Sequence, residues 1–349
     1  MAPARAAAAA LFEAVVRIRN HMYDSALLRQ NRLPRPVISI GNLTFGGSGK
    51  TPLAIHLAQT VCRLGATPVL LSRGYGRTDQ NDLILEPGRE PAASAERLGD
   101  EPALLRRRVP ELWLGISADR YAVGLEISAL CARPIFILDD GYQHRRLARN
   151  LNLLIIDSAQ PLAGNRLMPR GSLREPLEYM KRADVILING GFGHPSSNAG
   201  ESCVRSHMRP DAAVFHCVQE IAGLVPFQEW QLAGYSYQAL IHAQPVYLVA
   251  AIGNPDRFHR DVKALNLEIT GARFFRDHAR LTHTDWLACA AEASRTGAGS
   301  IVTTEKDAVK ISRAPDFPLL VAVQGTRIAE QLEMEKRLSP LIGSCCEAD

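Results

Sequence analysis

The sequence has few cysteines, and none of them stands in a C-x-x-C pair. The seven cysteines are scattered over 349 residues, and the two that are adjacent, Cys345 and Cys346, lie in the C-terminal tail. An odd set of thiols without regular spacing excludes a disulfide framework and argues against a zinc centre. The pattern is typical of a cytoplasmic protein whose thiols stay reduced.

Long apolar runs are missing as well. No stretch approaches the roughly 20 apolar residues that a membrane-spanning helix needs. The alanine-rich start has no convincing signal-peptide cleavage region, so we expect it to be retained. Apolar residues make up 46% of the chain and charged residues 22%, which are ordinary values for a folded globular protein.

The chain also lacks a strong excess of charge. Its formal net charge is only +4, which excludes a polycation built to bind nucleic acid. We expect no nucleic-acid partner, and we expect the chain to act as a monomer. Locally the charge is uneven, because the first 35 residues contain six arginines but only two acids, Glu13 and Asp24. This local excess suits contact with phosphate groups or anionic lipid headgroups.

The same N-terminal stretch carries an apolar stripe. Leu11, Val15, Ile18 and Met22 recur at steps of four, three and four, which predicts an amphipathic helix over about residues 6–28. Such a helix either packs on its own domain or lies on a membrane surface. From these residues alone, the packed arrangement is slightly favoured.

The rest of the chain alternates short apolar runs with helix-length segments. This alternation predicts an α/β fold with a mainly parallel sheet flanked by helices on both faces. The pattern weakens between residues 191 and 220, and a smaller α/β lobe is expected after it. The predicted strands cover residues 37–40, 69–71, 135–138, 153–156, 185–188, 246–251, 301–304 and 319–323.

A glycine-rich segment separates the first predicted strand from a helix predicted over residues 51–64. A strand-to-helix junction of this kind exposes backbone N–H groups to a phosphate. Lys50 is expected to reach the β- and γ-phosphates, and the hydroxyl of Thr51 to bind Mg²⁺. The segment departs from the pattern G-x-x-x-x-G-K-[ST] at Thr44, and a turn that merely joins strand to helix is the alternative. The predicted nucleotide-binding residues are Thr44, Phe45, Gly46, Gly47, Ser48, Gly49, Lys50 and Thr51.

Several polar clusters follow other predicted elements. Asp139 and Asp140 end the run 135–138, where P-loop enzymes place the acids that hold Mg²⁺, although an ordinary turn also explains them. Residues 72–77 contain two arginines on a flexible backbone, which suits either an anionic acceptor or a solvated loop.

Two further clusters have sufficient structural explanations. Asp100 and Glu101 open a predicted helix, for which N-capping accounts. Asp277 and His278 lie in a polar loop, where a surface histidine is the ordinary explanation.

Taken in order, these strings resemble the tetraacyldisaccharide 4'-kinase family from about residue 37 to residue 310. The most specific are DDGYQH at 139–144 and TEKDA at 304–308, which are unusual among P-loop proteins. The other matching strings are IGNLT at 40–44 continuing to Thr51-Pro52, SRGYGR at 72–77, GDEP at 99–102, GNP at 253–255 and DH at 277–278.

The resemblance implies a kinase that uses ATP and Mg²⁺ to phosphorylate the 4' hydroxyl of a tetraacyldisaccharide 1-phosphate, giving lipid IV-A in lipid A synthesis. It implies Asp100 as general base, His278 as its partner and Lys50 as the catalytic phosphate-binding cation. The implied metal residues are Thr51, Asp139, Asp140 and Glu175, and the implied acceptor residues are Arg73, Tyr75, Arg77, Gln143 and His144.

The resemblance also favours the membrane-surface arrangement of the first helix, with the enzyme bound peripherally at the cytoplasmic face of the inner membrane. It divides the chain into an amphipathic helix at 1–33, a P-loop kinase core at 34–220 and a C-terminal α/β lobe at 221–349. Two alternatives share the phosphate loop: a kinase of another small-molecule acceptor, and a nucleotide-dependent switch that transfers no group.

Overall fold

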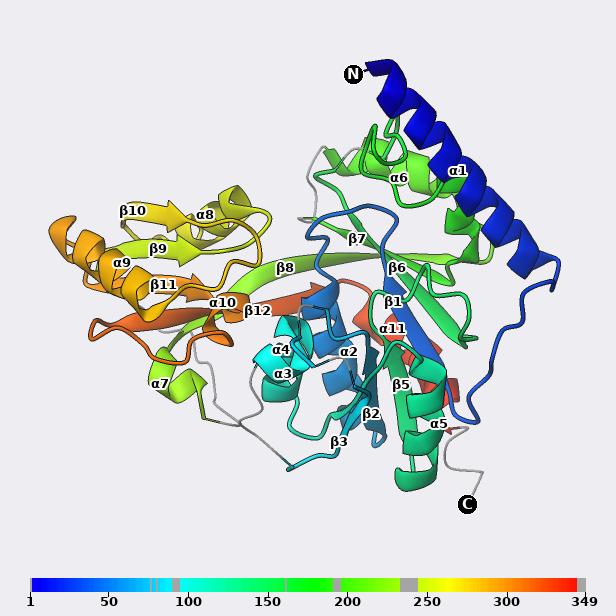
Figure 1. The fold of residues 1–349 in the computed structure, drawn as a ribbon, viewed down its shortest axis with the longest axis horizontal. Coiled ribbons are helices and arrows are strands. Elements are labelled where there is room, and N and C mark those ends of the chain that lie inside the picture. The colour runs from blue at the N-terminus through cyan, green and yellow to red at the C-terminus, as the bar shows by residue number, and fades with distance from the viewer. Residues whose placement is uncertain are drawn as a thin grey trace.

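The computed structural model describes residues 2–75, 77–79, 81–89, 95–160, 162–190, 196–232 and 244–343. Within them, one sheet of twelve strands runs through two lobes and is covered by helices on both faces (Figure 1). The strands are β1 (Val37–Gly41), β2 (Thr67–Ser72), β3 (Leu83–Leu85), β4 (Trp113–Ile116), β5 (Pro134–Leu138), β6 (Leu151–Asp157), β7 (Val185–Asn189), β8 (Ala213–Pro226), β9 (Val246–Ala250), β10 (Ile269–Phe274), β11 (Ser300–Thr304) and β12 (Leu319–Ile328).

The order of the strands is β10-β9-β11-β12-β8-β7-β6-β1-β5-β2-β4-β3. Most neighbours are parallel, and the antiparallel pairs are β3 with β4 and β8 with β12. Every residue of β1, β5, β6, β7 and β9 is buried, as expected for parallel strands covered on both faces. The predicted α/β fold with a mainly parallel sheet is therefore confirmed.

The described residues contain eleven α-helices and one 3₁₀ helix. They are α1 (Ala2–Asp24), α2 (Lys50–Arg63), α3 (Ala95–Leu98), α4 (Asp100–Arg108), α5 (Arg120–Leu130), the 3₁₀ helix η1 (Leu177–Arg182), α6 (Ser196–His207), α7 (Phe227–Trp230), α8 (Pro255–Lys263), α9 (His283–Arg295), α10 (Glu305–Ala308) and α11 (Gln331–Gly343).

Neighbouring side chains along a strand enter different cores, as the alternation of a pleated strand requires. In β2, Leu70 packs in the core that contains α2 and α4, whereas Val69 and Leu71 pack in the core that contains α5. The first of these cores continues into the C-terminal lobe, where it includes Trp286 of α9. One face of the sheet is thus packed continuously across both lobes.

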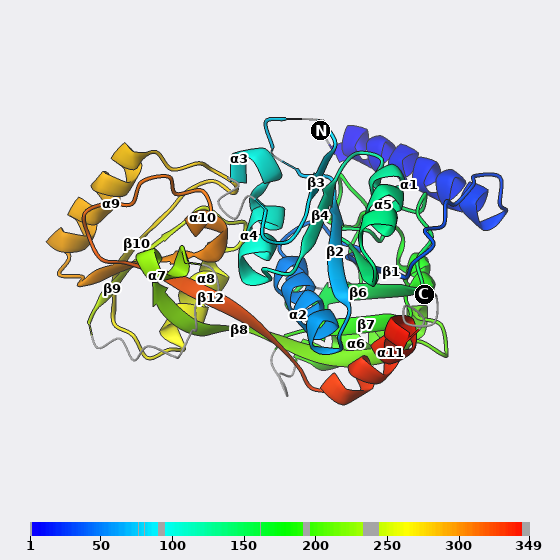
Figure 2. The same cartoon turned by 90° about the horizontal axis from the view of Figure 1, so that it is seen from below.

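The strands β8 and β12 connect the two lobes (Figures 1 and 2). Their antiparallel register runs from Leu320 opposite Pro226 to Ile328 opposite Cys217. The predicted boundary between residues 220 and 221 falls inside β8, so one continuous strand crosses it, and the division into domains stays a prediction. After β12 the chain returns to the first lobe. There Gln331 Oε1 of α11 lies 2.9 Å from His56 Nε2 of α2.

The N-terminal helix is shifted from its predicted position, since it ends at Asp24 and the chain then turns through Ala26, whose φ is 59°. The stripe does not pack on the protein: Leu11, Val15 and Ile18 are 68%, 55% and 60% exposed. The helix is instead attached by its opposite face, where Ala9 is buried, Phe12 packs against a hydrophobic core, and the polar contacts described below are made.

A buried ion pair joins α4 to the C-terminal lobe. Arg108 Nη1 donates to both carboxylate oxygens of Glu305, at 3.0 and 2.9 Å, and both side chains are 4% exposed. The backbone N–H of Gln324 and the indole N–H of Trp230 also donate to Glu305. Removing one partner of such a pair leaves a buried charge uncompensated.

We expect Glu305→Gln to lower the free energy of unfolding by about 3 kcal/mol, because the charge of Arg108 would stay buried without its counter-ion. Urea unfolding followed by circular dichroism measures the change. Glu333→Gln is the matched control, since Glu333 forms an exposed pair with Lys336 and its loss should cost under about 1 kcal/mol. Equal losses of unfolding free energy in the two variants would contradict a stabilising role for the buried pair of Arg108 and Glu305.

Candidate functional site

The phosphate loop is held in place from the strands beside it. It lies between β1 and α2, and Gly49 caps the helix with a φ of 90°. Gln219 of β8 donates to the carbonyl of Gly49 at 2.6 Å, and Asn189 of β7 donates to the carbonyl of Ser48 at 3.1 Å. A Cβ atom at Gly49 would lie 2.0 Å from Gln219 Nε2, so glycine is required there. The loop therefore presents a fixed backbone at the N-terminus of α2.

Lys50 and Asp140 face each other beside this loop. The Lys50 ammonium lies 3.5 Å from Asp140 Oδ1, and Arg174 Nη1 donates to Asp140 Oδ2 at 2.7 Å. Burial raises the pKa of Asp140, but Lys50 and Arg174 outweigh burial and hold that pKa below its ordinary value. Arg174 also lies over the ring of Phe45, 4.4 Å from its centroid.

Glu101 connects the phosphate loop to the C-terminal lobe. Its Oε1 atom accepts a hydrogen bond from the hydroxyl of Thr51 at 3.0 Å and another from the ammonium of Lys306 at 2.7 Å. Burial raises the pKa of Glu101, but Lys306 and then Lys50 outweigh burial. They lower the pKa to about 2 and keep the carboxylate ionised. Sequence reasoning explained Glu101 only as a helix-start acid, and its place in the GDEP string was the available signal.

Asp139 completes a crowded group of carboxylates. It is 6% exposed at the end of β5, and its pKa is raised by burial and by the negative charges of Glu101 and Asp140. Such crowding leaves negative charge that a divalent cation would neutralise.

The chemistry of this group fits Mg²⁺. Carboxylate and hydroxyl oxygens are the ligands that Mg²⁺ prefers, and it takes the rest of its octahedron from water and phosphate. In the part of the chain that the structure describes, no three His, Cys, Asp or Glu side chains converge as a ready-made metal centre. A metal here would accordingly depend on Thr51 and on the nucleotide for part of its coordination.

Asp100 and His278, which the resemblance implies as base and partner, meet across the two lobes. Asp100 is the first residue of α4, and its Oδ2 atom lies 3.2 Å from His278 Nδ1. His278 has a φ of 59° in the loop between β10 and α9, and its N–H donates to the carbonyl of Ala251 at 3.1 Å. The His278 side chain is half exposed and that of Asp100 mostly covered, so the pair stands at the edge of the site.

Among the predicted acceptor residues, Tyr75 contacts this pair. The ring of Tyr75, which is 86% exposed, lies edge-on to His278 with centroids 6.5 Å apart. Arg77 is buried beneath Gly74, where an added Cβ would lie 2.8 Å from Arg77 Cδ. The pKa of His144 falls to about 4 because of burial and nearby guanidinium groups, among them Arg73. These residues surround the carboxyl ends of β2 and β5.

Gln143 and Arg120 complete the description of this group. The Gln143 amide donates to the carbonyl of Asn42 at 2.9 Å, and its own carbonyl accepts from Arg19 of α1 at 2.8 Å. Arg120, which sequence reasoning missed, is buried and donates to the carbonyl of Asp139 at 3.4 Å. Its position at the start of α5 carries no local signal of a site.

The structure does not bring Glu175 to the carboxylate group. Its carboxylate is buried, forms an ion pair with Arg182 and accepts from Asn20 Nδ2 at 3.3 Å. Arg145 Nη1 donates to the carbonyl of Asn20 at 3.0 Å. Glu175 also lies before η1, whose N-cap is Pro176. Its charge is engaged in fastening α1 to the protein, which is the physical reason to leave it out of the metal group.

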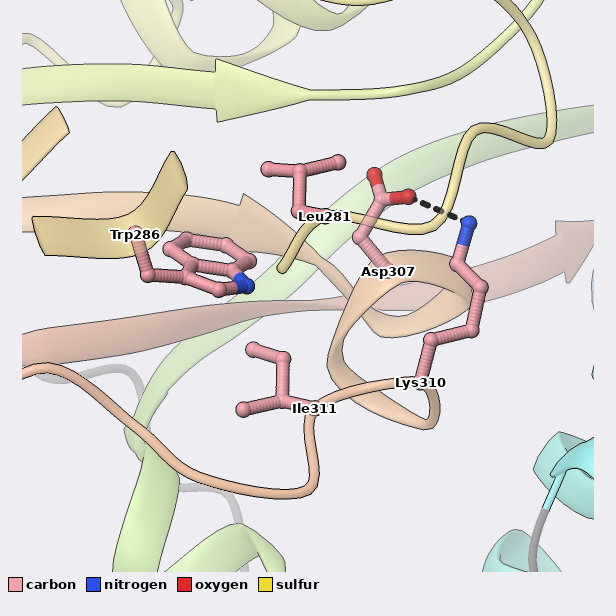
Figure 3. Close-up of a pocket in the computed structure, with 5 residues that line it drawn as sticks. All are labelled: Leu281, Trp286, Asp307, Lys310 and Ile311. Carbon is pink, nitrogen blue, oxygen red and sulfur yellow. Dashed lines mark ion pairs between the residues drawn. The ribbon is translucent and has the colours of Figure 1, made fainter. Parts of the chain in front are cut away.

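Asp307 of the TEKDA string is held in the C-terminal lobe, where it pairs with Lys310 (Figure 3). Asp307 accepts from the N–H of Ala251 and the hydroxyl of Thr304, and its other oxygen lies 2.8 Å from the ammonium of Lys310. A small hollow beside this pair, which Trp286 also lines, has no room for a water-sized ligand. These contacts are structural, and they hold Lys306, which lies between Glu305 and Asp307, in place.

We expect Asp100→Asn to lower the pKa of His278, because the hydrogen bond to Asp100 is the largest cause of its raised pKa. NMR titration of the His278 ring measures the shift. The raised pKa means that the pair stabilises the fold fully below the ordinary value of 6.5, and that this stabilisation is lost as the pH rises through the raised pKa. Asp277→Asn should shift the titration less. An unchanged titration in Asp100→Asn would show that the pair does not form in solution.

Comparison with known proteins points to one family. The family model described as "Tetraacyldisaccharide-1-P 4'-kinase" matches residues 2–342. A tetraacyldisaccharide 4'-kinase of Chlorobium limicola is 35% identical over 311 residues, covering 88% of this chain and 86% of the relative. One from Geobacter sulfurreducens is 35% identical over 346 residues, covering 96% and 92%. A crystal structure of LpxK from Aquifex aeolicus in complex with ATP matches with a TM-score of 0.77 and 26% identity, covering 97% of this chain and 99% of that one.

Proposed function

This chain belongs to the tetraacyldisaccharide-1-P 4'-kinase family, and we propose that it performs the family's reaction where the two lobes meet. It is an ATP-dependent kinase of lipid A biosynthesis that phosphorylates the 4' hydroxyl of tetraacyldisaccharide 1-phosphate to give lipid IV-A. The observation that supports this placement is the pair Asp100 and Glu101. One side chain faces His278, and the other faces Thr51 of the phosphate loop.

The phosphate side of the reaction is assigned to the loop and the carboxylate group. Lys50, at the N-terminus of α2, would neutralise charge on the β- and γ-phosphates. Thr51, Glu101, Asp139 and Asp140 would hold Mg²⁺, with Arg174 keeping Asp140 in place. When bound, the metal supplies further neutralisation of the triphosphate charge.

The acceptor side is assigned to the interlobe pair and the residues around it. The 4' oxygen forms its bond to the γ-phosphorus while the bond from that phosphorus to the bridging oxygen breaks, and ADP leaves. Asp100, assisted by His278, would take the hydroxyl proton. Tyr75, with Arg73 and His144, would orient the disaccharide. These residues would be held in position by Arg77, Gln143 and Arg120.

We expect Lys50→Ala to lower the rate of transfer of γ-³²P from ATP to tetraacyldisaccharide 1-phosphate by about 1,000-fold, since charge neutralisation supplies most of the acceleration. Asp100→Ala should lower it by about 100-fold, the usual share of a general base. The assay uses MgATP and the lipid in detergent micelles. Asp211→Ala, an exposed acid paired with Arg209, is the control and should match the wild type.

The same assay tests the alternatives. ATP hydrolysis without labelled lipid would indicate a nucleotide-dependent switch. Labelling of a soluble sugar but not of the lipid would indicate a kinase of another acceptor.

The N-terminal helix is proposed to bind the cytoplasmic surface of the inner membrane. In the part of the chain described by the structure, no helix is long and apolar enough to cross a bilayer. The exposed side chains of Leu11, Val15 and Ile18 suit the headgroup boundary. Arg17 and Arg19 instead contact Glu178 and the Gln143 backbone on the protein side. Peripheral binding through one helix face would bring the acceptor residues close to a lipid that stays in its bilayer.

We expect the triple variant Leu11→Gln, Val15→Gln and Ile18→Gln to reduce binding to vesicles containing anionic lipid, because each substitution removes apolar area from the inserted face. Nucleotide binding should be unchanged. Substitution is preferable to deletion of residues 1–30, since Asn20 is buried and its loss would disturb Glu175 and Arg145.

The matched control is Leu265→Gln, Leu287→Gln and Leu332→Gln, which alters exposed leucines elsewhere on the protein. Vesicle co-sedimentation measures both variants. Equal binding by the helix variant and the wild type would reject the proposed membrane contact.

A further inference from the structure

The three charged residues of the TEKDA string point to different places. Glu305 and Asp307 are 3% and 2% exposed. Glu305 pairs with Arg108 of α4, and Asp307 accepts hydrogen bonds in the core of the C-terminal lobe. Lys306, between them, leaves that core and reaches α4 of the first lobe. Its backbone is therefore immobilised on both sides while its ammonium crosses the boundary between the lobes.

The ammonium of Lys306 ends beside the phosphate loop. It donates to Glu101 Oε1 at 2.7 Å, and the same oxygen atom accepts from the hydroxyl of Thr51 at 3.0 Å. The negative charges of Asp139 and Asp277 also act on Lys306. The ammonium thus lies between the residues assigned to the triphosphate and the loop that carries the general-base partner.

We propose that Lys306 is a second phosphate-binding cation, which the C-terminal lobe supplies to the γ-phosphate of the bound nucleotide. In this structure the carboxylate oxygen of Glu101 stands in for a phosphate oxygen as the acceptor of the ammonium. The inference rests on the proposed function, because it requires a triphosphate in the loop.

The physical reason for a second cation is the charge of the transferring group. In a loose transition state the negative charge is spread over the equatorial oxygens of the γ-phosphoryl group, and cations already in place stabilise it without reorganisation. Lys50 approaches from the phosphate loop, and Lys306 approaches from the opposite lobe. Lys306 is such a cation already in place, since its buried neighbours Glu305 and Asp307 fix its position before the nucleotide arrives.

The test compares two nucleotides that differ only at the γ position. Isothermal titration of the full chain with ADP and with the non-hydrolysable triphosphate AMP-PNP, both with Mg²⁺, gives the affinity that the γ-phosphate adds. We expect Lys306→Gln to weaken AMP-PNP binding by about 10-fold, as the loss of one charge-assisted hydrogen bond predicts, and to leave ADP binding unchanged. Lys306→Arg should keep most of the triphosphate affinity. Lys336→Gln, which removes an exposed lysine of α11, is the control.

A role limited to holding Glu101 or the lobes together gives a different result. It predicts that Lys306→Gln weakens both nucleotides equally or neither, and either result overturns the proposal. Thermal unfolding checks that the variants are folded, and Lys306→Arg decides the matter if the glutamine variant is not.

The γ-³²P assay on the wild type separates the two levels of inference. Wild-type enzyme that labels the lipid while AMP-PNP binding is insensitive to Lys306→Gln would reject the role of Lys306 alone. Wild-type enzyme that labels no lipid would reject the proposed function.

Discussion

Backbone hydrogen bonds between β8 and β12 join the two lobes into one sheet, and the contacts across the site depend on them. Leu320 to Ile328 pair with Pro226 to Cys217, with one register shift between Val323 and Gln324, so the C-terminal lobe cannot move as a free appendage. The strand β8 also carries Gln219, which holds the carbonyl of Gly49. A single strand thereby supports the phosphate loop and leads into the lobe that supplies His278.

The site itself is a balance of charges drawn from both lobes. Three acids, Glu101, Asp139 and Asp140, lie within reach of the cations Lys50, Arg174 and Lys306. Negative charge is in excess around Asp139, whose pKa is raised by burial and by its two acidic neighbours. This arrangement favours a ligand that brings its own divalent cation and its own phosphates, because such a ligand replaces the internal pairs with equivalent ones.

Local signals in the sequence were sufficient for the parts built from adjacent residues. Residues 37–51 form strand, loop and helix as predicted, and Asp139 and Asp140 follow a buried strand. The sequence did not reveal β8, because polar residues that include Gln219 and Glu220 divide it into two short apolar runs and no single run marks the whole strand. Glu101 and Lys306 lie in strings of the family resemblance, but their contacts, like that of Arg120, appeared only in the fold, since no spacing in the chain indicates that they meet other parts of the site. The contacts of Glu175 could not be predicted for the same reason: its partners, Asn20 and Arg182, come from α1 and η1.

The attachment of α1 has a consequence for how the enzyme meets its acceptor. The helix is fastened by Asn20 to Arg145 and Glu175, and Arg19 bonds the backbone of Gln143 in the acceptor group. With the opposite face in the headgroup layer, as proposed, the length of these contacts would set the height of the acceptor residues above the bilayer. The encounter would then be a search in two dimensions, governed by the surface density of the lipid and by lateral diffusion, and the bulk concentration of acceptor would cease to be the relevant variable.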